Sequence, residues 1–398
     1  MGVDEPAPRR GINTGCLEGR RILVATGGSI SIYRVPDIIR EMRREGAKVK
    51  VAMGKASQAL ISHEVFRWAS GNDVITEVSG RLEHISDVEG SDALVLMPAS
   101  FDTIGKCANG IADEVQPLMF SNAVGSGVPV LFVPAMHQGM FRSPALRRNT
   151  DILRSMGALF VEPVVEEGKA KLAGPAEVID AVARALAGQR GGRYLVVSGR
   201  GEEVIDPVRV VTNRSTGLMG YWISRWLYRL GAGAIEYVGN CSRQLPSYVN
   251  FRPAHTAEEF EEGVSEAMRS AQFDGVFLCA ALPDFTLDRH HSKIPSSSEV
   301  TLKLTPRRKM VEALRPLQAR NLVAFRLTDS GDSDVWGHFA GYEPDVVVSN
   351  YYDAQDGAFG DVSNRYVIHT RHGSFDLGVM PKELAARRIV EHVMGVIP

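Results

Sequence analysis

The chain has 398 residues, of which 44% are hydrophobic and 23% charged. This balance is typical of a soluble globular protein and excludes a disordered or fibrous one, and the length allows two domains of ordinary size. The net charge of -2 offers no basic field for nucleic acid, and no segment approaches the roughly 20 apolar residues of a membrane span. The four cysteines lie far apart without metal-site spacing, which favours a reduced cytoplasmic chain that handles small molecules.

The first half of the chain alternates strands and helices. After a polar segment, residues 1–18, that we expect to be a loose tail, the apolar run Arg20–Gly28 predicts a strand that ends in a glycine turn. Two further strands are predicted at Ala93–Ser100 and Val128–Met136, and helices at Asp37–Glu45, Thr103–Asn109, Pro144–Met156 and Pro175–Ala187. This alternation predicts a mainly parallel sheet with helices on both faces, in a domain of residues 19–187.

A Gly/Arg-rich segment, residues 188–192, predicts a linker to a second domain of residues 193–398. That domain begins like the first, with a buried strand and glycine turn at Tyr194–Gly201, followed by a helix that ends at Gly231. Further strands are predicted at Ala234–Val238, Gly275–Cys279, Leu322–Phe325 and Asp345–Ser349, a hairpin at Arg365–Thr370 and Ser374–Val379, and a closing helix at Lys382–Met394.

The segment DPVRVVTNRSTGLMG, Asp206 to Gly220, is the most informative stretch. It follows a strand, precedes a helix and combines arginine, asparagine and a Ser-Thr-Gly turn, an arrangement suited to an anionic nucleotide. The alternative is a solvated loop. In the first domain the turn at Gly27 lacks both GxGxxG and GxxxxGK[ST], so a dinucleotide fold or a P-loop is not expected.

These segments, with LEHISD, PASFDT and PAMHQGMF in the first half and CAALPDF and SKIP in the second, resemble a known family. It is the family in which phosphopantothenoylcysteine decarboxylase is fused to phosphopantothenate-cysteine ligase, and the likeness covers about Gly19 to Pro398. It implies two doubly wound α/β domains, an N-terminal flavodoxin-like flavin-binding domain of the homo-oligomeric flavin-containing cysteine decarboxylase type and a C-terminal Rossmann-like ligase domain.

In the first domain the resemblance implies an FMN site. The matching residues are Gly28, Ser29, Ile30, Pro98, Ala99, Ser100, Thr103 and Met136. His84 falls on the family's catalytic histidine, and an imidazole suits proton transfer near neutrality. His137 stands where an asparagine usually binds the substrate carboxylate, and the flap Glu166–Gly174 lacks the usual cysteine; Lys169 or Lys171 is a conjectural proton donor there. Both departures resemble the archaeal branch.

In the second domain the resemblance gives Arg209, Asn213 and Lys293 catalytic roles: a guanidinium fork, an amide that orients the attacked carbonyl, and a cation for the departing pyrophosphate. The expected nucleotide- and substrate-binding residues are Asp206, Ser215, Thr216, Gly217, Ala280, Ala281, Asp284, Phe325 and Asn350, with Asp284 also a magnesium ligand. The Phe-Gly loop, Ala358 to Asn364, also matches, whereas Leu218 replaces the family's lysine.

The resemblance therefore implies a bifunctional enzyme of coenzyme A synthesis. CTP and magnesium would support ligation of 4′-phosphopantothenate with cysteine, and FMN would support decarboxylation of the product to 4′-phosphopantetheine. A homo-oligomer is expected, with trimeric contacts in the first domain and dimeric contacts in the second, and with neither nucleic acid nor membrane as a partner. Two alternatives stay open: a paralogue with ligase activity alone, and a non-catalytic flavin-binding regulatory protein.

Overall fold

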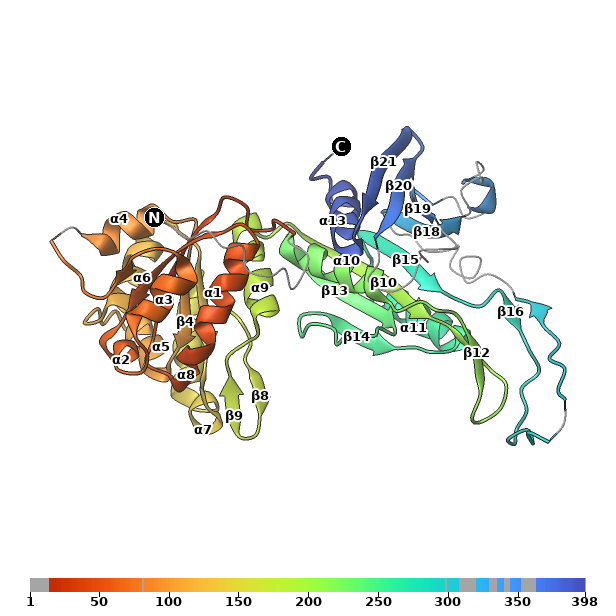
Figure 1. The fold of residues 1–398 in the computed structure, drawn as a ribbon, viewed down its shortest axis with the longest axis horizontal. Helices are drawn as coiled ribbons and strands as arrows, with labels where there is room; N and C mark the ends of the chain where they lie inside the picture. The colour runs from red at the N-terminus through yellow and green to blue at the C-terminus, as the bar shows by residue number, and fades with distance from the viewer. Residues whose placement is uncertain are drawn as a thin grey trace. The chain divides into compact units, whose positions relative to one another are not determined.

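The computed structural model describes residues 14–80, 82–297, 299–307, 320–328, 335–339, 344–351 and 363–397. The chain divides between Gln189 and Arg190 into two compact units, and each contains a mainly parallel sheet (Figure 1). Both units confirm the predicted doubly wound α/β fold. No helix in the described ranges is long and apolar enough to cross a membrane.

The first unit is built on a six-stranded parallel sheet in the order β3-β2-β1-β4-β5-β7. The strands are β1 (Arg21–Thr26), β2 (Lys48–Met53), β3 (Val74–Ile75), β4 (Ala93–Ala99), β5 (Val130–Pro134) and β7 (Leu159–Phe160). The three predicted strands are confirmed as β1, β4 and β5. In the central strand, Ile22 lies opposite Val49 of β2 and Ala93 of β4.

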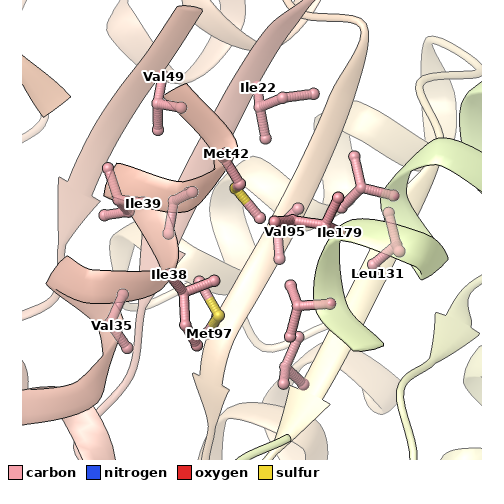
Figure 2. Packing of buried hydrophobic residues seen from close by; sticks show 14 of the residues in the cluster. Ile22, Val35, Ile38, Ile39, Met42, Val49, Val95, Met97, Leu131 and Ile179 are labelled. Carbon is pink, nitrogen blue, oxygen red and sulfur yellow. The ribbon is translucent and has the colours of Figure 1, made fainter. Parts of the chain in front are cut away.

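Helices cover both faces of this sheet. On one face, α1 (Val35–Arg44) buries Val35, Ile38, Ile39 and Met42, a spacing of three and four residues that places them on one side of the helix. These side chains meet Ile179 of α9 (Pro175–Ala187) and the apolar residues of the sheet (Figure 2). On the other face lie α5 (Phe101–Ala108), α6 (Val115–Gly125) and α8 (Pro144–Ser155).

The chain between Thr14 and Gly19 belongs to this unit. Leu17 is fully buried in the core beneath α1, and the backbone N–H groups of Thr14 and Cys16 donate to the carboxylate of Glu45. The expectation of a loose tail is therefore wrong for residues 14–18, because one apolar side chain and one acceptor at the end of α1 anchor them.

The second unit contains an eight-stranded sheet in the order β14-β13-β10-β15-β18-β19-β20-β21. Its strands are β10 (Gly191–Arg200), β13 (Ala232–Gly239), β14 (Asn250–Pro253), β15 (Gly275–Ala281), β18 (Leu322–Thr328), β19 (Val346–Tyr351), β20 (Asn364–Thr370) and β21 (Gly373–Met380). β20 and β21 form the predicted antiparallel hairpin. β19 and β20 are also antiparallel, and all other neighbouring strands of this sheet are parallel.

Within the described residues, three helices cover this second sheet. On one side, α11 (Ala257–Ser270) packs Phe260 and Val264 against β10 and β15. Two other helices, α10 (Leu218–Arg229) and α13 (Lys382–Val393), pack together, and the indole N–H of Trp226 donates to the carbonyl of Glu383 at 2.9 Å. The sequence predicted α10 and α13 but not α11.

Both units also contain short helices and strands. In the first are η1 (Ile30–Arg34), α2 (Lys55–Gln58), α3 (His63–Ser70), α4 (Glu83–Glu89), β6 (Met136–His137), α7 (Gln138–Phe141), β8 (Val164–Glu166) and β9 (Lys169–Lys171). In the second are β11 (Glu202–Val204), β12 (Val210–Thr212), β16 (Phe285–Thr286), β17 (Thr305–Pro306) and η2 (Gly337–Phe339).

In each sheet the strand order reverses at one point. In the first sheet, β1 lies between β2 and β4, and the strands that follow each of these continue outward in opposite directions. In the second sheet, β10 lies between β13 and β15 in the same way. The loops after two such strands diverge, which opens a crevice at the carboxyl edge where ligands of open α/β sheets bind. The predicted motifs follow β1, β4, β10 and β15, so both candidate sites lie at these edges.

Candidate active sites

At the first edge, the turn after β1 lies close to the end of β4. The N–H of Gly27 donates to the carbonyl of Pro98 at 3.1 Å, and a Cβ on Gly27 would lie 2.6 Å from that oxygen. A Cβ on Gly28 would lie 2.6 Å from Cβ of Ala56. Only glycine fits at these two positions, because neighbouring backbone and side chain already fill the space.

The residues that follow this turn contact the segment just after β5. The hydroxyl of Ser29 donates to the carbonyl of Ala135 at 3.1 Å, while the side chain of Ile30 is 73% exposed. The structure thus brings Gly28, Ser29 and Ile30 to the same edge as Met136, which follows Ala135.

The segment PASFDT forms the end of β4 and the start of α5. Pro98 and Ala99 are buried, and Ser100 caps the helix by accepting the N–H of Thr103 at 3.1 Å. Asp102 is exposed in the first helical turn and pairs with Lys106 at 3.3 Å. A hydrogen bond from Lys106 to Asp113, together with the charge of Asp102, raises the pKa of Lys106. Lys106 therefore balances the charge of the Asp102 carboxylate.

His84 lies in the first turn of α4 and is half-buried. Its carbonyl accepts the side-chain N–H of Asn122 at 3.0 Å, which ties α4 to α6. Its ring nitrogen Nδ1 is buried and has no hydrogen-bond partner among the described residues. A buried polar atom without a partner is costly, so this nitrogen suits a ligand or substrate group.

The flap of the first unit is an ordered hairpin. Strand β9 pairs with β8 on one side and with β6 on the other, so that Lys169 lies directly opposite His137. The N–H of Gln138 donates to the carbonyl of Gly168 at 3.0 Å, which holds the tip of the hairpin. The predicted flap and the predicted carboxylate-binding histidine therefore share one small sheet.

The two lysines of this flap differ in their partners. Lys171 pairs with Glu166 and Glu167, each at 2.8 Å, and these hydrogen bonds raise its pKa. Lys169 is exposed and carries no such pair within the described residues. Nδ1 of His137 accepts the N–H of Gly139 at 3.3 Å, which directs a ring proton to Nε2 in the neutral form.

At the edge of the second sheet, Asp206 is almost completely buried. Its Oδ1 accepts the N–H groups of Val208 at 2.8 Å and Arg209 at 2.9 Å, and its Oδ2 accepts Nη1 of Arg209 at 2.6 Å and the N–H of Ile294 at 3.1 Å. Burial opposes ionisation, but these donors outweigh it and lower the pKa of Asp206 to about 2. The carboxylate is thus a charged anchor for its own loop.

Arg209 extends this anchor to the segment that carries Lys293. The same Nη1 that contacts Asp206 also donates to the carbonyl of Ile294 at 3.1 Å. The side chain of Arg209 is 39% exposed. Lys293 itself is exposed and precedes the anchored residue. The structure therefore brings Asp206, Arg209 and Lys293 together, although 85 residues separate Arg209 from Ile294.

Asn213 connects two predicted motifs. Its side-chain amide donates to the carbonyl of Ala281 at the end of β15, and its Oδ1 accepts the N–H of Ser215 at 2.9 Å. Ala280 precedes this carbonyl on the same strand. The amide thus holds backbone here, rather than standing free to orient a substrate carbonyl.

The Ser-Thr-Gly turn precedes α10 and packs on the loop after β13. The carbonyl of Thr216 accepts the N–H of Ser242 at 2.9 Å. Gly217 has φ of +71°, and a Cβ there would lie 2.3 Å from the carbonyl oxygen of Asn240. The close approach and the left-handed backbone both require glycine at this position.

Asp284 is exposed three residues beyond β15, and its carbonyl accepts the N–H of Arg307 at 2.9 Å. Across the described ranges, no three His, Cys, Asp or Glu side chains form a group that could hold a metal ion. Phe325 lies within β18 and Asn350 near the end of β19, both half-buried. The Phe-Gly loop falls mostly on residues 358–362, outside the described residues.

Sequence reasoning missed a second anchor of the Lys293 segment. Arg307 donates to the buried carboxylate of Glu203 at 2.6 Å and also pairs with Glu258, while the hydroxyl of Thr286 donates to Glu203 at 3.1 Å. Arg307 and Glu203 are 104 residues apart, and no local motif marks either of them.

Two family models match the chain. One, described as Flavoprotein, matches residues 10–187, and the other, the DNA/pantothenate metabolism flavoprotein C-terminal domain, matches residues 189–396. Among solved structures, that of the FMN-dependent cysteine decarboxylase SpaF is 26% identical, covers 42% of this chain and 98% of its own, and gives a TM-score of 0.39.

Curated relatives match over nearly the whole length. The coenzyme A biosynthesis bifunctional protein of Thermococcus kodakarensis is 31% identical over 392 residues, which cover 95% of each chain. Its counterpart from Methanocaldococcus jannaschii is 30% identical over 401 residues, covering 98% of this chain and 96% of the relative. Both relatives are archaeal, as the changes at His137 and in the flap predicted. The chain belongs to the family of coenzyme A biosynthesis bifunctional proteins, with a flavoprotein half followed by a pantothenate-metabolism half.

Proposed function

We propose that this protein catalyses two successive steps of coenzyme A synthesis in the cytoplasm. Residues 193–398 join 4′-phosphopantothenate to cysteine with CTP, and residues 19–187 decarboxylate the product to 4′-phosphopantetheine. The observation that carries the proposal is a match to a bifunctional relative over 95% of the chain. The motifs of both halves also follow the strands at which the order of each sheet reverses.

The residues at the first edge fit FMN. Gly28 and Ser29 would approach its phosphate, the start of α5 at Ser100 and Thr103 would lie beside it, and the exposed Ile30 would cover apolar surface. The orphaned Nδ1 of His84 supports a ligand next to α4. When bound, FMN would supply reversible oxidation of the cysteinyl thiol, the chemistry that makes the neighbouring carboxylate labile.

The protein groups of the first half then have separate tasks. His84 would move a proton at the thiol, since imidazole exchanges protons near neutrality. His137 would bind the substrate carboxylate through Nε2, because its Nδ1 already accepts the N–H of Gly139. Lys169 lies opposite His137 on the flap and, unlike Lys171, has no ion pair with a carboxylate in the described residues. Lys169 would return a proton after carbon dioxide leaves.

The second half would perform acyl activation. The carboxylate of phosphopantothenate attacks the α-phosphorus of CTP, pyrophosphate leaves, and the amine of cysteine then displaces CMP from the acyl carbon. Lys293 and the exposed part of Arg209 would stabilise the negative charge of the leaving group. A single carboxylate, Asp284, fits magnesium that arrives with the nucleotide, because Mg²⁺ takes most of its ligands from phosphate and water.

We also propose a homo-oligomer, with trimeric contacts in the first half and dimeric contacts in the second. In the second half, Val300, Leu302 and Leu304 alternate along an extended segment and are 44%, 37% and 50% exposed. Val208, which precedes β12, and Val210, its first residue, are exposed as well. Apolar alternation on an exposed segment suits pairing with a second copy of the chain.

The proposed function is tested by mass spectrometry of products after purified, FMN-loaded protein is incubated with 4′-phosphopantothenate, cysteine, CTP and magnesium. We expect 4′-phosphopantetheine. Accumulation of phosphopantothenoylcysteine would refute the decarboxylase half and leave a ligase. A flavin-loaded protein that forms neither product would refute the ligase half. If it also leaves added phosphopantothenoylcysteine unchanged, both halves are refuted and the regulatory alternative is favoured.

A further inference from the structure

The segment that carries Lys293 leaves the second unit as an arm, defined here as the described residues 287–297 and 299–304 between β16 and β17. Its two ends pair antiparallel, with Phe285 opposite Pro306 and Thr286 opposite Thr305 (Figure 1). Residues 290–293 of this arm are exposed. A long exposed segment does not place a catalytic side chain by itself, so an anchor near Lys293 is needed for a defined position.

Such an anchor exists on both sides of Lys293. Before it, the N–H of His290 donates to the carbonyl of Ile205 at 2.8 Å. After it, Ile294 is held twice: its N–H donates to Oδ2 of Asp206 at 3.1 Å, and its carbonyl accepts Nη1 of Arg209 at 3.1 Å. Lys293 therefore lies between two backbone positions that are bound to the loop after β11.

Asp206 is the centre of this arrangement. Its Oδ1 closes its own turn by accepting the N–H groups of Val208 and Arg209, and its Oδ2 faces outward to Ile294 and to Nη1 of Arg209. One carboxylate thus orients the guanidinium of Arg209 and holds the residue next to Lys293. The donors outweigh the effect of burial and lower the pKa of this carboxylate to about 2, so it is ionised near neutral pH.

We propose that Asp206 is a positioning residue of the ligation reaction, which fixes Lys293 relative to Arg209 through the backbone of Ile294. The inference rests on the proposed function, in which Lys293 stabilises the leaving pyrophosphate. It changes the role expected of Asp206 from contact with the nucleotide to control of the arm. Because both oxygens of the carboxylate are already taken by donors of this chain, Asp206 has little capacity left for a ligand.

The sharpest variant is Asp206→Asn. Asparagine keeps one acceptor for the turn N–H groups of Val208 and Arg209, but it places an NH₂ group against the donors of Ile294 and Arg209. The turn is thus retained while the hold on the arm is lost. Glu203→Gln is the matched control, because Glu203 anchors the base of the same arm through Arg307 and Thr286, away from Ile294.

Two measurements on the full chain test the proposal: hydrogen exchange of peptides that cover residues 288–296, and steady-state ligation kinetics. In Asp206→Asn we expect faster exchange at residues 288–296 and a kcat for ligation lowered by about 10- to 100-fold, with a smaller change in KM for CTP. In Glu203→Gln we expect faster exchange near residues 286 and 307 and a smaller loss of kcat. Decarboxylation of added phosphopantothenoylcysteine should be equal in all variants.

A double variant separates positioning from general destabilisation. If Asp206 acts through Lys293, Asp206→Asn should lower kcat by less in a Lys293→Gln background than in the wild-type chain; any loss that remains there reflects the contact with Arg209. Unchanged exchange at residues 288–296 would overturn the proposal, as would faster exchange with wild-type kcat or fully additive losses. If Asp206→Asn does not fold, Ile294→Pro removes the N–H donor to the carboxylate, although it also fixes φ at residue 294 and restricts the backbone of Lys293; it should give the same pattern of faster exchange and lower kcat.

Failure of the proposed function gives a different result. A wild-type chain that makes no phosphopantothenoylcysteine refutes the ligation itself, and a fully active Lys293→Gln refutes the role of that lysine. In both cases the exchange of residues 288–296 still decides whether Asp206 holds the arm, because that readout needs no turnover.

Discussion

The side-chain amide of Asn213 donates to the carbonyl of Ala281 and joins the loop after β12 to the end of β15. Ala281 ends β15, which neighbours β10 where the strand order of the second sheet reverses. The Oδ1 of Asn213 also accepts the N–H of Ser215, so both the nitrogen and the oxygen of the amide bind backbone groups. The predicted catalytic asparagine therefore shapes the site, whatever it contacts in a complex.

This arrangement predicts a strong effect of Asn213→Asp. The carboxylate would face the Ala281 carbonyl without a proton to donate, which should destabilise the second unit by about 1–3 kcal/mol and lower ligation by about tenfold or more. Thermal unfolding and ligation kinetics measure the two effects. Asn72→Asp is the control, because Asn72 donates in the same way to Val49 in the first unit; it should leave ligation intact, and equal loss in both variants would contradict a local role.

Gly217→Ala should destabilise the second unit by more than its backbone strain alone. Its φ of +71° costs about 1 kcal/mol for alanine, and the added Cβ would also lie 2.3 Å from the Asn240 carbonyl. Gly395 has a similar φ of +66° but open space around the missing Cβ, so Gly395→Ala measures the strain by itself. Denaturant unfolding of both variants gives the comparison, and equal losses would show that the contact with Asn240 relaxes without cost.

His84→Asn should abolish release of carbon dioxide while ligation persists. The buried Nδ1 has no partner among the described residues, and loss of a positioned general acid–base group typically costs about 10²- to 10⁴-fold in rate. Carbon dioxide release from phosphopantothenoylcysteine measures the effect. His63→Asn changes an exposed histidine beside Glu64 and should behave as wild type; unchanged decarboxylation in His84→Asn would remove His84 from the mechanism.

His369 should make the second unit less stable in mild acid. Its Nε2 and Nδ1 lie 2.8 Å from the hydroxyls of Ser349 and Ser374, and burial lowers its pKa. The unfolded chain, with a histidine pKa near about 6.5, therefore binds more protons below that pH than the folded chain does. The contribution of His369 to the stability of the second unit is fully present above this pKa. It is lost as the pH falls through the lower pKa that His369 has in the folded state.

The unfolding midpoint measured from pH 8 to pH 5 tests this pH dependence. His369→Gln should flatten the decline relative to wild type, because the titrating group is gone. His255→Gln removes an exposed histidine of the same unit and should keep the wild-type slope. A decline of equal steepness in His369→Gln would contradict the assignment.

Much of the architecture could be read from local patterns. Buried apolar runs that end in glycine turns predicted β1 and β10, and three- and four-residue spacing predicted α1 and α13, because a strand or helix must turn an apolar surface to the core. The helix α6 was missed, since its apolar residues leave no clear stripe. The strand β2 was missed because it follows α1 after only a short turn.

The sequence by itself determined the two α/β halves and the family, and it predicted which side chains carry the chemistry, because those depend on residue types and on spacing along the chain. Only the tertiary structure decided how these side chains are held. Ile294 meets Asp206 across 88 residues, and Lys169 lies opposite His137 because two strands pair in one register. Such contacts leave no local pattern, since loops far apart in sequence meet only where the strand order of a sheet brings them to one edge.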